Sequence, residues 1–442
     1  MTELRIRASQ LRELRHSLLG AAHEKCAVLL ATVTQHAGGD SVLLVREVVY
    51  PDEAEHVIKA EDAAELSPGF VARVASTARR AGLALIFVHT HPGSGRPSFS
   101  PIDGRGELAL AAFLERRAIE GPHAALVMSK GGLRARHLGA AEEVGVVSVG
   151  DTLRSEFTPD ECAPDLDERF DRQVRAFGAE GQRALQRLRV AIVGLGGTGS
   201  IAAQQLVHLG VRDLLLIDPD VVEETNLNRV VNAQPADVGR PKVQVAQRYL
   251  EPFGARVETL LADVTHAAAA KRLCDVDVIL ACTDSHGSRS VIQQVAYQYL
   301  IPCIDIGSTI LAKAGKVAGI YGRVQLLGPD HACLWCSDLL DPAQVRHDMM
   351  SERERSQDPY IPGAREPAPA VVSLNGTVVS LAVTMLLGLV TEAPIAGRHL
   401  IYDASTARLR SIRTEARQDC FLCSSAGLLA AGDKQALFAR QA

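Results

Sequence analysis

The stretch Val190–Ser200, VAIVGLGGTGS, constrains the fold of this chain more than any other. The apolar run 188–193 predicts a buried strand, and a helical pattern begins at Ser200. Four glycines form the junction between them: Gly194, Gly196, Gly197 and Gly199. At such a junction, backbone N–H groups and the positive end of the helix dipole attract phosphate. The stretch therefore predicts a nucleotide-binding βαβ unit.

The residues after this unit favour a site that breaks a triphosphate. Asp218 follows Gly199 by 19 positions, at the end of a second apolar run, and suits a ribose-binding carboxylate. A third apolar run, 276–281, leads to Asp284. Further polar residues follow Asp218: Asp220, Asn226, Arg229 and Lys242. Cations neutralise charge on transferring phosphoryl oxygens, and a carboxylate can hold magnesium. A hydride-transfer site needs neither these cations nor a carboxylate that holds magnesium. An NAD-dependent oxidoreductase is therefore kept only as an alternative.

From ERFDRQVRAFGAEGQRAL (Glu168–Leu185) through the glycine loop, DPDVVEETNLNR, GRPK and TDS to two CxxC motifs, the chain resembles the ThiF/MoeB/HesA ubiquitin-activating family. Members adenylate the C-terminal carboxylate of a ubiquitin-like or sulfur-carrier protein. The resemblance implies a Rossmann-like adenylation domain that uses ATP and magnesium. It also implies residue roles: Asp218 at the ribose, with Asp220 beside it; Asn226, Arg229 and Lys242 at the phosphates; Asp284 at magnesium and the α-phosphate; and Arg172 reaching the ATP across a homodimer.

A second informative stretch is HTHPGSGRPSFSPID, which follows the strand-like run 83–88. Two imidazoles, His89 and His91, can converge on one cation, and Asp103 can supply a third ligand across a Pro/Gly-rich loop. Three protein ligands leave a position for water, which is typical of a catalytic zinc site. Zinc lowers the pKa of that water and polarises a carbonyl, and a nearby carboxylate takes the proton.

The pattern HxHP, seven residues, then SxxD resembles the JAB/JAMM (MPN+) metalloprotease motif. Members cleave isopeptide or C-terminal peptide bonds of ubiquitin-like proteins. The resemblance implies an N-terminal mixed α/β domain with His89, His91 and Asp103 as zinc ligands. It also implies that Glu24 is the general base and that Ser100 supports the oxyanion. Glu47 is an alternative to Glu24.

The third candidate site lies near the end of the sequence. Two CxxC pairs, Cys333 with Cys336 and Cys420 with Cys423, predict a tetrahedral structural zinc site. Relatives that form a thioester carry a cysteine after the first pair, but 337–374 contains none. The acyl-adenylate is therefore expected to pass directly to an acceptor protein or a sulfur donor. The polar segment 346–369 is expected to form a mobile crossover loop.

These patterns predict an α/β chain in three parts. Residues 1–150 form the JAB/JAMM domain, 151–167 a linker, and 168–442 the ThiF-type domain with its four-cysteine zinc site. A net charge of −5 argues against nucleic acid or an anionic membrane as a partner. The charged N-terminus is unlike a signal peptide, and the apolar run 378–390 is too short to span a bilayer. Nine cysteines without an export signal predict a reducing cytoplasm.

Both resemblances concern the tail of a ubiquitin-like protein. We therefore expect a bifunctional enzyme that adenylates a Gly-Gly C-terminus and hydrolyses bonds formed there. The partner would be a ubiquitin-like or sulfur-carrier protein, joined by a conjugating enzyme or a sulfur donor. Two alternatives remain besides the oxidoreductase: a sulfur-carrier adenylyltransferase for cofactor or amino-acid biosynthesis, and a non-catalytic scaffold.

Overall fold

The computed structural model describes residues 2–20, 23–59, 64–159, 165–313, 316–351, 354 and 369–441. Its contacts divide the chain into two compact units. Unit 1 contains Met1–Cys162, Gln298–Leu300 and Ser425–Ala436. Unit 2 contains Ala163–Tyr297, Ile301–Ser424 and Leu437–Ala442. Each unit has its own sheet and its own candidate sites.

Unit 1 is built on an eight-stranded mixed sheet, in the order β10-β9-β1-β3-β2-β6-β7-β8. Its strands are β1 (Glu3–Arg7), β2 (Cys26–Gln35), β3 (Ser41–Val49), β6 (Ala84–Thr90), β7 (Ala124–Ser129), β8 (Gly132–His137), β9 (Gly145–Val149) and β10 (Leu153–Phe157). A separate two-stranded sheet pairs β4 (His56–Lys59) with β5 (Ala64–Leu66). β2 and β6 run antiparallel, so Cys26 lies opposite His89.

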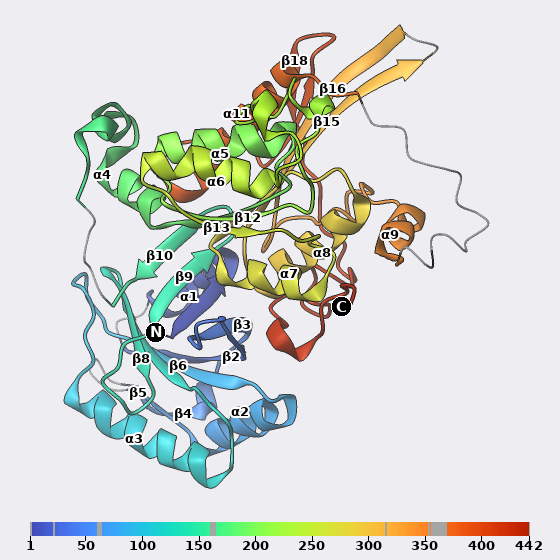
Figure 1. Ribbon diagram of the computed structural model, residues 1–442. Helices are drawn as coiled ribbons and strands as arrows, with labels where there is room; N and C mark the ends of the chain where they lie inside the picture. Colours follow the sequence, from blue (N-terminus) through green and yellow to red (C-terminus); the bar gives the residue numbers. More distant parts are fainter. Residues whose placement is uncertain are drawn as a thin grey trace. The chain divides into compact units, whose positions relative to one another are not determined.

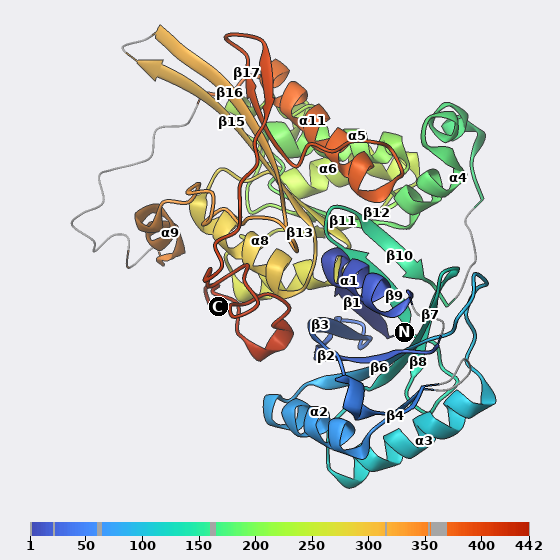
Figure 2. The same ribbon diagram turned by 180° about the vertical axis from the view of Figure 1, so that it is seen from behind.

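Helices cover both faces of this sheet, as Figures 1 and 2 show. They are α1 (Ala8–Leu18), α2 (Pro68–Ala81) and α3 (Pro101–Arg116). α1 packs Leu11 and Leu14 against Leu29 and its neighbours on one face. α2 and α3 pack Phe70 and Leu114 against the other face. Because both faces are buried there, β6 and β7 are apolar and buried along most of their length.

The contacts divide the chain between residues 162 and 163, which lies inside the predicted linker. The predicted linker 151–167 contains β10, which pairs antiparallel with β9 as an edge strand of the first sheet. Its composition is polar because an edge strand of this kind buries only part of its surface; Arg154 and Ser155 are exposed. Two segments distant in sequence also belong to unit 1: Tyr299 Oη donates to the Asp433 carboxylate at 2.8 Å, and Thr34 also bonds that carboxylate.

Unit 2 has an eight-stranded sheet in the order β13-β12-β11-β14-β15-β16-β17-β18. The strands are β11 (Arg189–Val193), β12 (Asp213–Ile217), β13 (Arg256–Leu260), β14 (Val278–Ala281), β15 (Cys303–Lys313), β16 (Lys316–Leu327), β17 (His399–Asp403) and β18 (Arg408–Ser411). The first five in the sheet order pair in parallel, and the rest antiparallel. The order reverses at β11, between β12 and β14, and ligands bind at such a switch point. This confirms the Rossmann-like prediction.

The helices of unit 2 lie on both sides of its sheet (Figure 1). They are α4 (Asp171–Arg187), α5 (Gly197–Leu209), α6 (Lys242–Leu250), α7 (Ala267–Arg272), α8 (His286–Gln298), α9 (Pro342–Met349) and α11 (Val372–Val390). α11 is long and apolar enough to cross a membrane by length and composition. In the structure it packs against α5, β15 and β16, with Val378, Val379 and Leu386 buried. Those contacts are typical of a core helix. The expected crossover segment 346–369 lies largely outside the described residues.

Candidate functional site

The glycine loop joins β11 to α5 with little room for side chains. Gly194 has φ +89°, and a Cβ there would lie 2.8 Å from the Cys282 carbonyl oxygen at the end of β14. A Cβ on Gly199 would collide with the Gly194 oxygen at 1.8 Å. A Cβ on Gly196, by contrast, would have no atom within 4 Å, so the space at the N-terminus of α5 is open. An open helix N-terminus fits the phosphate cradle that the sequence predicted, and the binding of phosphate there stays a prediction.

Asp218 lies at the end of β12 and braces this loop. One carboxylate oxygen accepts from the Leu195 N–H at 2.5 Å, and the other accepts from the Asp220 N–H at 2.8 Å. Burial raises the pKa of Asp218, and the Lys242 charge and these N–H groups offset part of the rise. The structure thus places Asp218 at the loop; its contact with a ribose remains a prediction.

Two cations stand near the cradle. The Arg229 side chain passes 3.4 Å from where a Cβ of Gly197 would be, and its guanidinium bonds the Thr225 carbonyl oxygen at 2.5 Å. Lys242 pairs with Asp220 at 2.7 Å and is largely shielded from solvent. Asn226 is instead buried in a short turn, where its Oδ1 accepts from the Glu223 N–H at 3.3 Å. Its predicted phosphate contact is untested, and in this structure it shapes the turn that carries Arg229.

Asn375 is a polar residue of this site that sequence reasoning missed. A Cβ on Gly197 would lie 2.2 Å from Asn375 Nδ2, and Asn375 Oδ1 accepts from Ser308 at 3.0 Å. Asn375 is buried near the start of α11, whose other buried residues are all apolar. A lone amide in such a helix was the signal that could have identified it.

Asp284 lies exposed between β14 and α8. It follows closely after Cys282, whose carbonyl oxygen would lie 2.8 Å from a Cβ on Gly194, so Asp284 is next to the glycine loop. The N-terminus of α8 is capped twice. Ser285 Oγ accepts from the Ser288 N–H at 3.0 Å, and Asp348 of α9 accepts from the Gly287 N–H at 3.0 Å. Asp348 is sixty-one positions from Gly287 in the sequence. Its hydrogen bond therefore holds α9 against the N-terminus of α8, which lies beside Asp284.

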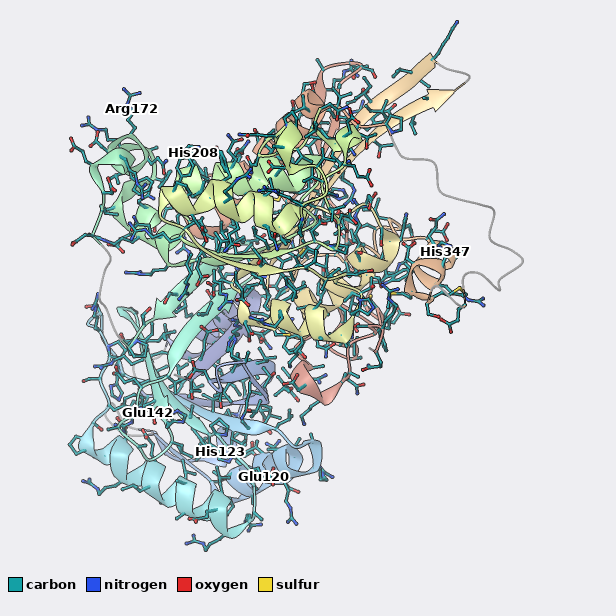
Figure 3. The ribbon with its side chains drawn as sticks, in the orientation of Figure 1. Glu120, His123, Glu142, Arg172, His208 and His347 are labelled. Carbon is teal, nitrogen blue, oxygen red and sulfur yellow. The ribbon has the colours of Figure 1, made fainter. Side chains whose placement is uncertain are left out.

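Arg172 does not join this group in the described chain. It lies on α4, exposed, and Figure 3 shows it pointing outward. No contact among the described residues links it to Arg229 or Lys242. Supply of Arg172 by a second copy therefore remains a prediction.

A buried charge cluster lies further along the sheet, on β15. Asp305 is fully buried, and its carboxylate pairs with Arg289 at 3.1 Å and with Arg323. Burial raises the pKa of Asp305, but the two guanidinium groups outweigh it and hold that pKa below its usual value. The carboxylate is therefore ionised in the folded state.

The four predicted zinc-binding cysteines converge in unit 2. All four are buried, and the Sγ–Sγ distance is 3.6 Å for Cys333 with Cys420 and for Cys336 with Cys423. Ligands about 2.3 Å from a tetrahedral zinc lie about 3.8 Å apart, whereas a disulfide would bring them to about 2.05 Å. The Arg417 N–H donates to Cys336 Sγ at 3.3 Å, as N–H groups around metal-bound thiolates do. The cluster fits a structural zinc.

A second cluster, in unit 1, joins His89, His91 and Asp103, whose ligand atoms all lie within 4.8 Å of one another. His89 Nε2 is 3.4 Å from Asp103 Oδ1, and His91 Nε2 is 3.5 Å from Asp103 Oδ2. Zinc bonds of about 2.0–2.2 Å in a tetrahedron separate ligand atoms by about 3.4 Å. His89 Nε2 is also buried without a hydrogen-bond partner among the described residues. An orphaned imidazole nitrogen at these distances fits a metal ligand.

Local structure and charge orient this cluster. Ser100 caps α3: its Oγ accepts from the Asp103 N–H at 3.2 Å, and Asp103 Oδ2 accepts from the Ser100 N–H at 2.6 Å. Burial raises the pKa of Asp103, but His89 and Ser100 outweigh it, and the net shift is strongly downward. Burial and the neighbouring His89 lower the pKa of His91, which favours the neutral form that binds metal. Ser100 thus positions a ligand; its oxyanion role is untested.

Glu24 is the carboxylate beside this cluster. It is buried, and its Oε1 lies 3.5 Å from His91 Nε2. Glu47, the alternative, is exposed on β3, where it pairs with Leu30 in mid-strand. The geometry favours Glu24 over Glu47, and the role of Glu24 as general base stays a prediction.

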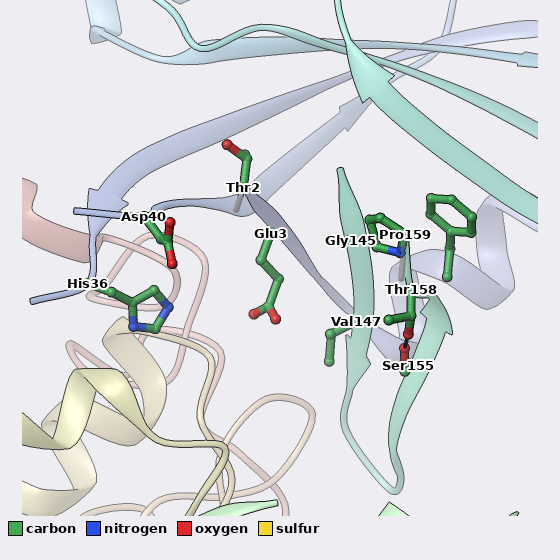
Figure 4. Close-up of a pocket in the computed structure, with 10 residues that line it drawn as sticks. Thr2, Glu3, His36, Asp40, Gly145, Val147, Ser155, Thr158 and Pro159 are labelled. Atoms are coloured by element: carbon green, nitrogen blue, oxygen red, sulfur yellow. Dashed lines mark hydrogen bonds between the residues drawn. The ribbon is translucent and has the colours of Figure 1, made fainter. Parts of the chain in front are cut away.

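A separate cavity of about 250 Å³ lies elsewhere in unit 1 (Figure 4). Glu3, His36 and Asp40 are among its lining residues. His36 follows the end of β2 opposite Cys26, and ten strand residues span about 30 Å. The cavity is therefore remote from His89 and His91.

Comparison with known proteins decides the family of unit 2. The model of the ThiF family matches residues 170–423. The chain belongs to the ThiF family. The match includes the glycine loop, the candidate phosphate residues and all four clustered cysteines. It lies outside residues 1–150, so the resemblance of unit 1 to JAB/JAMM proteases depends on its own residues and geometry.

Several curated relatives are named as adenylyltransferases, and others as activating enzymes of ubiquitin-like modifiers or SAMP. The molybdopterin-synthase adenylyltransferase of Escherichia coli is 30% identical over 263 residues, which are 58% of this chain and 95% of that protein. The sulfur carrier protein ThiS adenylyltransferase of E. coli is 27% identical over 265 residues, 58% of this chain and 94% of that protein. The adenylyltransferase and sulfurtransferase MOCS3 of Arabidopsis thaliana is 29% identical over 294 residues, 64% of this chain. The chain spans only 58% of that protein's length.

The solved structures that match are more distant. E. coli MccB with AMPCPP and MccA aligns with 59% of this chain and 75% of its own length. The identity is 17% and the TM-score 0.46.

Proposed function

We propose that unit 2 uses ATP to adenylate the C-terminal carboxylate of a small carrier protein that ends in Gly-Gly. The observation that carries this is the Arg229 side chain at the open N-terminus of α5, 3.4 Å from the Cβ position of Gly197. A cation there can neutralise charge on the phosphoryl group as it transfers, and nicotinamide chemistry has no use for it. Membership of the ThiF family supports the same reaction.

The reaction joins a carboxylate oxygen of the carrier to the α-phosphorus of ATP and breaks the bond to pyrophosphate. Arg229 and Lys242 stabilise the charge that moves onto the leaving pyrophosphate, and the N–H groups of α5 hold the phosphates. Asp218 keeps the loop in place and can reach the ribose. Magnesium, when bound by Asp284, would neutralise phosphate charge.

The carrier belongs to sulfur transfer in this proposal. The E. coli and Arabidopsis relatives are named for molybdopterin synthase, for a sulfur carrier and for sulfurtransferase activity. These names favour the sulfur-carrier alternative over protein conjugation. Detection of a thiocarboxylate on the carrier, by mass spectrometry of cell extracts, would test the choice.

The adenylate passes directly to a sulfur donor in this proposal, because the sequence has no cysteine in the segment where relatives that form a thioester carry one. The segment 337–374 has no cysteine. Burial raises the pKa of Cys282 to about 12, and burial likewise raises that of Cys303. A thiol of that kind is almost entirely protonated and unreactive at neutral pH.

ATP–pyrophosphate exchange tests the adenylation. Exchange should require a carrier ending in Gly-Gly, and Arg229→Ala or Lys242→Ala should lower its rate about a hundredfold, the scale for one charge-stabilising contact. Arg240→Ala is the matched control, since Arg240 is an exposed cation on the same segment that faces Asp237. Exchange that survives both first changes, or tight NAD binding without ATP binding, would refute the proposal. Mixing Arg172→Ala with Asp284→Ala protein tests the dimer: restored exchange would require one copy to supply Arg172 to the other.

A second activity is proposed for unit 1, metal-dependent hydrolysis of a peptide or isopeptide bond at such a tail. It is supported by the distances among His89, His91 and Asp103 and by Glu24, 3.5 Å from His91. Zinc held there would polarise the scissile carbonyl and lower the pKa of water. Glu24 would take the proton of the attacking water and pass it to the leaving amine.

Elemental analysis tests both metal sites at once. We expect two zinc ions per chain, one lost in His91→Ala and the other in Cys420→Ser. Full zinc content in both variants would refute the two assignments.

A further inference from the structure

A second cavity in unit 1 lies beside the candidate metal site. Its volume is about 230 Å³, and its lining includes Leu18, Leu19, His91, Pro92 and Lys130. His91 thus belongs both to this cavity and to the cluster with Asp103. Whatever occupies the cavity lies next to the bond that the site would cut.

The backbone fixes the position of Lys130 relative to His91. The His91 N–H donates to the Met128 carbonyl at 2.8 Å, and the Lys130 N–H donates to the Gly93 carbonyl at 3.2 Å. The next turn packs equally closely, because a Cβ on Gly131 would lie 2.4 Å from the Gly95 oxygen. The loop that follows β6 and the turn that follows β7 are therefore tied together, and Lys130 stands at a set place on the cavity rim.

Lys130 gives the rim of this cavity a positive charge. Among the residues that the structure describes, none accepts a hydrogen bond or forms an ion pair with Lys130 Nζ. The neighbouring Lys25, in contrast, donates to the Ser17 carbonyl at 3.1 Å and is engaged. Leu18, Leu19 and Pro92 supply apolar surface, and Thr90 and Gly93 complete the lining beside His91. A small anion with a partly apolar body matches this combination.

The size of the cavity sets the scale of the ligand. An engineered cavity of about 150 Å³ holds benzene, and drug-sized ligands fill about 300–1,000 Å³. A volume of about 230 Å³ lies between these values and suits one amino-acid residue.

We propose that this cavity binds the free C-terminal carboxylate of a short extension on the substrate tail, with Lys130 as the partner of that carboxylate. The proposal rests on the hydrolysis proposed above for unit 1. The residue before the scissile bond has no free carboxylate, because its carbonyl carbon is the atom that water attacks. A free carboxylate next to the site therefore belongs to the residue after the bond, which is the leaving group.

Unit 1 would thus remove a terminal residue from a carrier precursor. Water adds its oxygen to the acyl carbon, the C–N bond breaks, and a proton of that water passes through Glu24 to the nitrogen of the released amino acid. The new carboxylate is the group that an adenylation reaction consumes. Lysine side-chain conjugates of folded proteins carry no such carboxylate at the leaving nitrogen and would be poorer substrates.

Binding to the metal-free, full-length protein tests Lys130 without relying on hydrolysis. The probes are two fluorescent synthetic peptides ending in Gly-Gly-Ala, one with a free carboxylate and one amidated. We expect the free acid to bind about tenfold more tightly by anisotropy, the scale of one charge-assisted hydrogen bond. Lys130→Gln should remove this ratio, and Lys130→Arg should keep most of it. Arg96→Gln is the control, because Arg96 is an exposed cation on the same loop that does not line the cavity.

Cleavage with zinc separates the two proposals. We expect kcat/KM for the free acid to exceed that for the amide about tenfold, and Lys130→Gln to abolish the difference. Equal affinities in the wild type, or a ratio that survives Lys130→Gln, would overturn the carboxylate site even if both peptides are cut. Cleavage of neither peptide, with the Lys130-dependent binding ratio intact, would refute the hydrolase while the carboxylate site stands.

Discussion

The buried cluster on β15 allows a quantitative test. Asp305→Asn keeps the shape of the side chain but removes its charge, leaving Arg289 and Arg323 with no counter-charge. Breaking a buried ion pair costs about 3–5 kcal/mol. The two arginine side chains are 15% and 14% exposed, so water relieves part of the penalty and we expect about 3 kcal/mol. At about 2–4 °C per kcal/mol for a large domain, the melting temperature of unit 2 should fall by about 6–12 °C.

Scanning calorimetry of the full chain measures this change. The matched control is Asp171→Asn, which breaks an exposed pair with Arg175 on α4 and should cost about 0.5 kcal/mol or less. A loss in Asp305→Asn as small as that in the control would refute the reasoning. Acid supplies a second check. Because the folded pKa of Asp305 is lowered, its contribution is present above the unfolded pKa of about 3.9 and is lost as the pH falls through the folded value. The difference between wild type and variant should therefore shrink below about pH 4.

Three further predictions concern other parts of the chain. Gly197→Ala should weaken ATP binding measured by calorimetric titration, because its Cβ would lie 2.2 Å from Asn375 Nδ2 and would displace that side chain at the glycine loop. Cys420→Ser should lower the melting temperature of unit 2 as well as its zinc content, since metal affinity at such sites is folding free energy. Burial lowers the pKa of His123, so the folded state disfavours its charge and stability should fall as the pH drops below about 6.5. His123→Gln should reduce that loss between urea melts at about pH 7.5 and about pH 5.5, and an unchanged pH slope would contradict the reasoning.

Sequence patterns predicted the parts of the fold that are determined by neighbouring residues in the sequence. The apolar runs became β11, β12 and β14, and the glycines between β11 and α5 marked a tight turn that their Cβ positions confirm. The HxH motif and each CxxC motif place two ligands close together locally, and the two CxxC motifs were expected to meet because a structural zinc needs four ligands.

Features that depend on distant partners could not be read in the same way. β1 escaped prediction because charged residues alternate with Leu4 and Ile6, and only its pairing with β3 and β9 makes it a central strand. Asp348 and Asn375 act across long sequence separations, so their local patterns resemble an ordinary polar helix and an ordinary apolar helix.

The four-cysteine cluster also has a consequence for chain integrity. Its pairs join positions 87 residues apart, so the metal would clasp both ends of the interval that contains α9 and α11. A protease that cut once inside this interval would produce two polypeptides on a denaturing gel but one particle in solution. A chelator would then remove the metal, and the two fragments of the nicked chain could separate. The intact chain has no such dependence on zinc, because its peptide bonds still join the two parts.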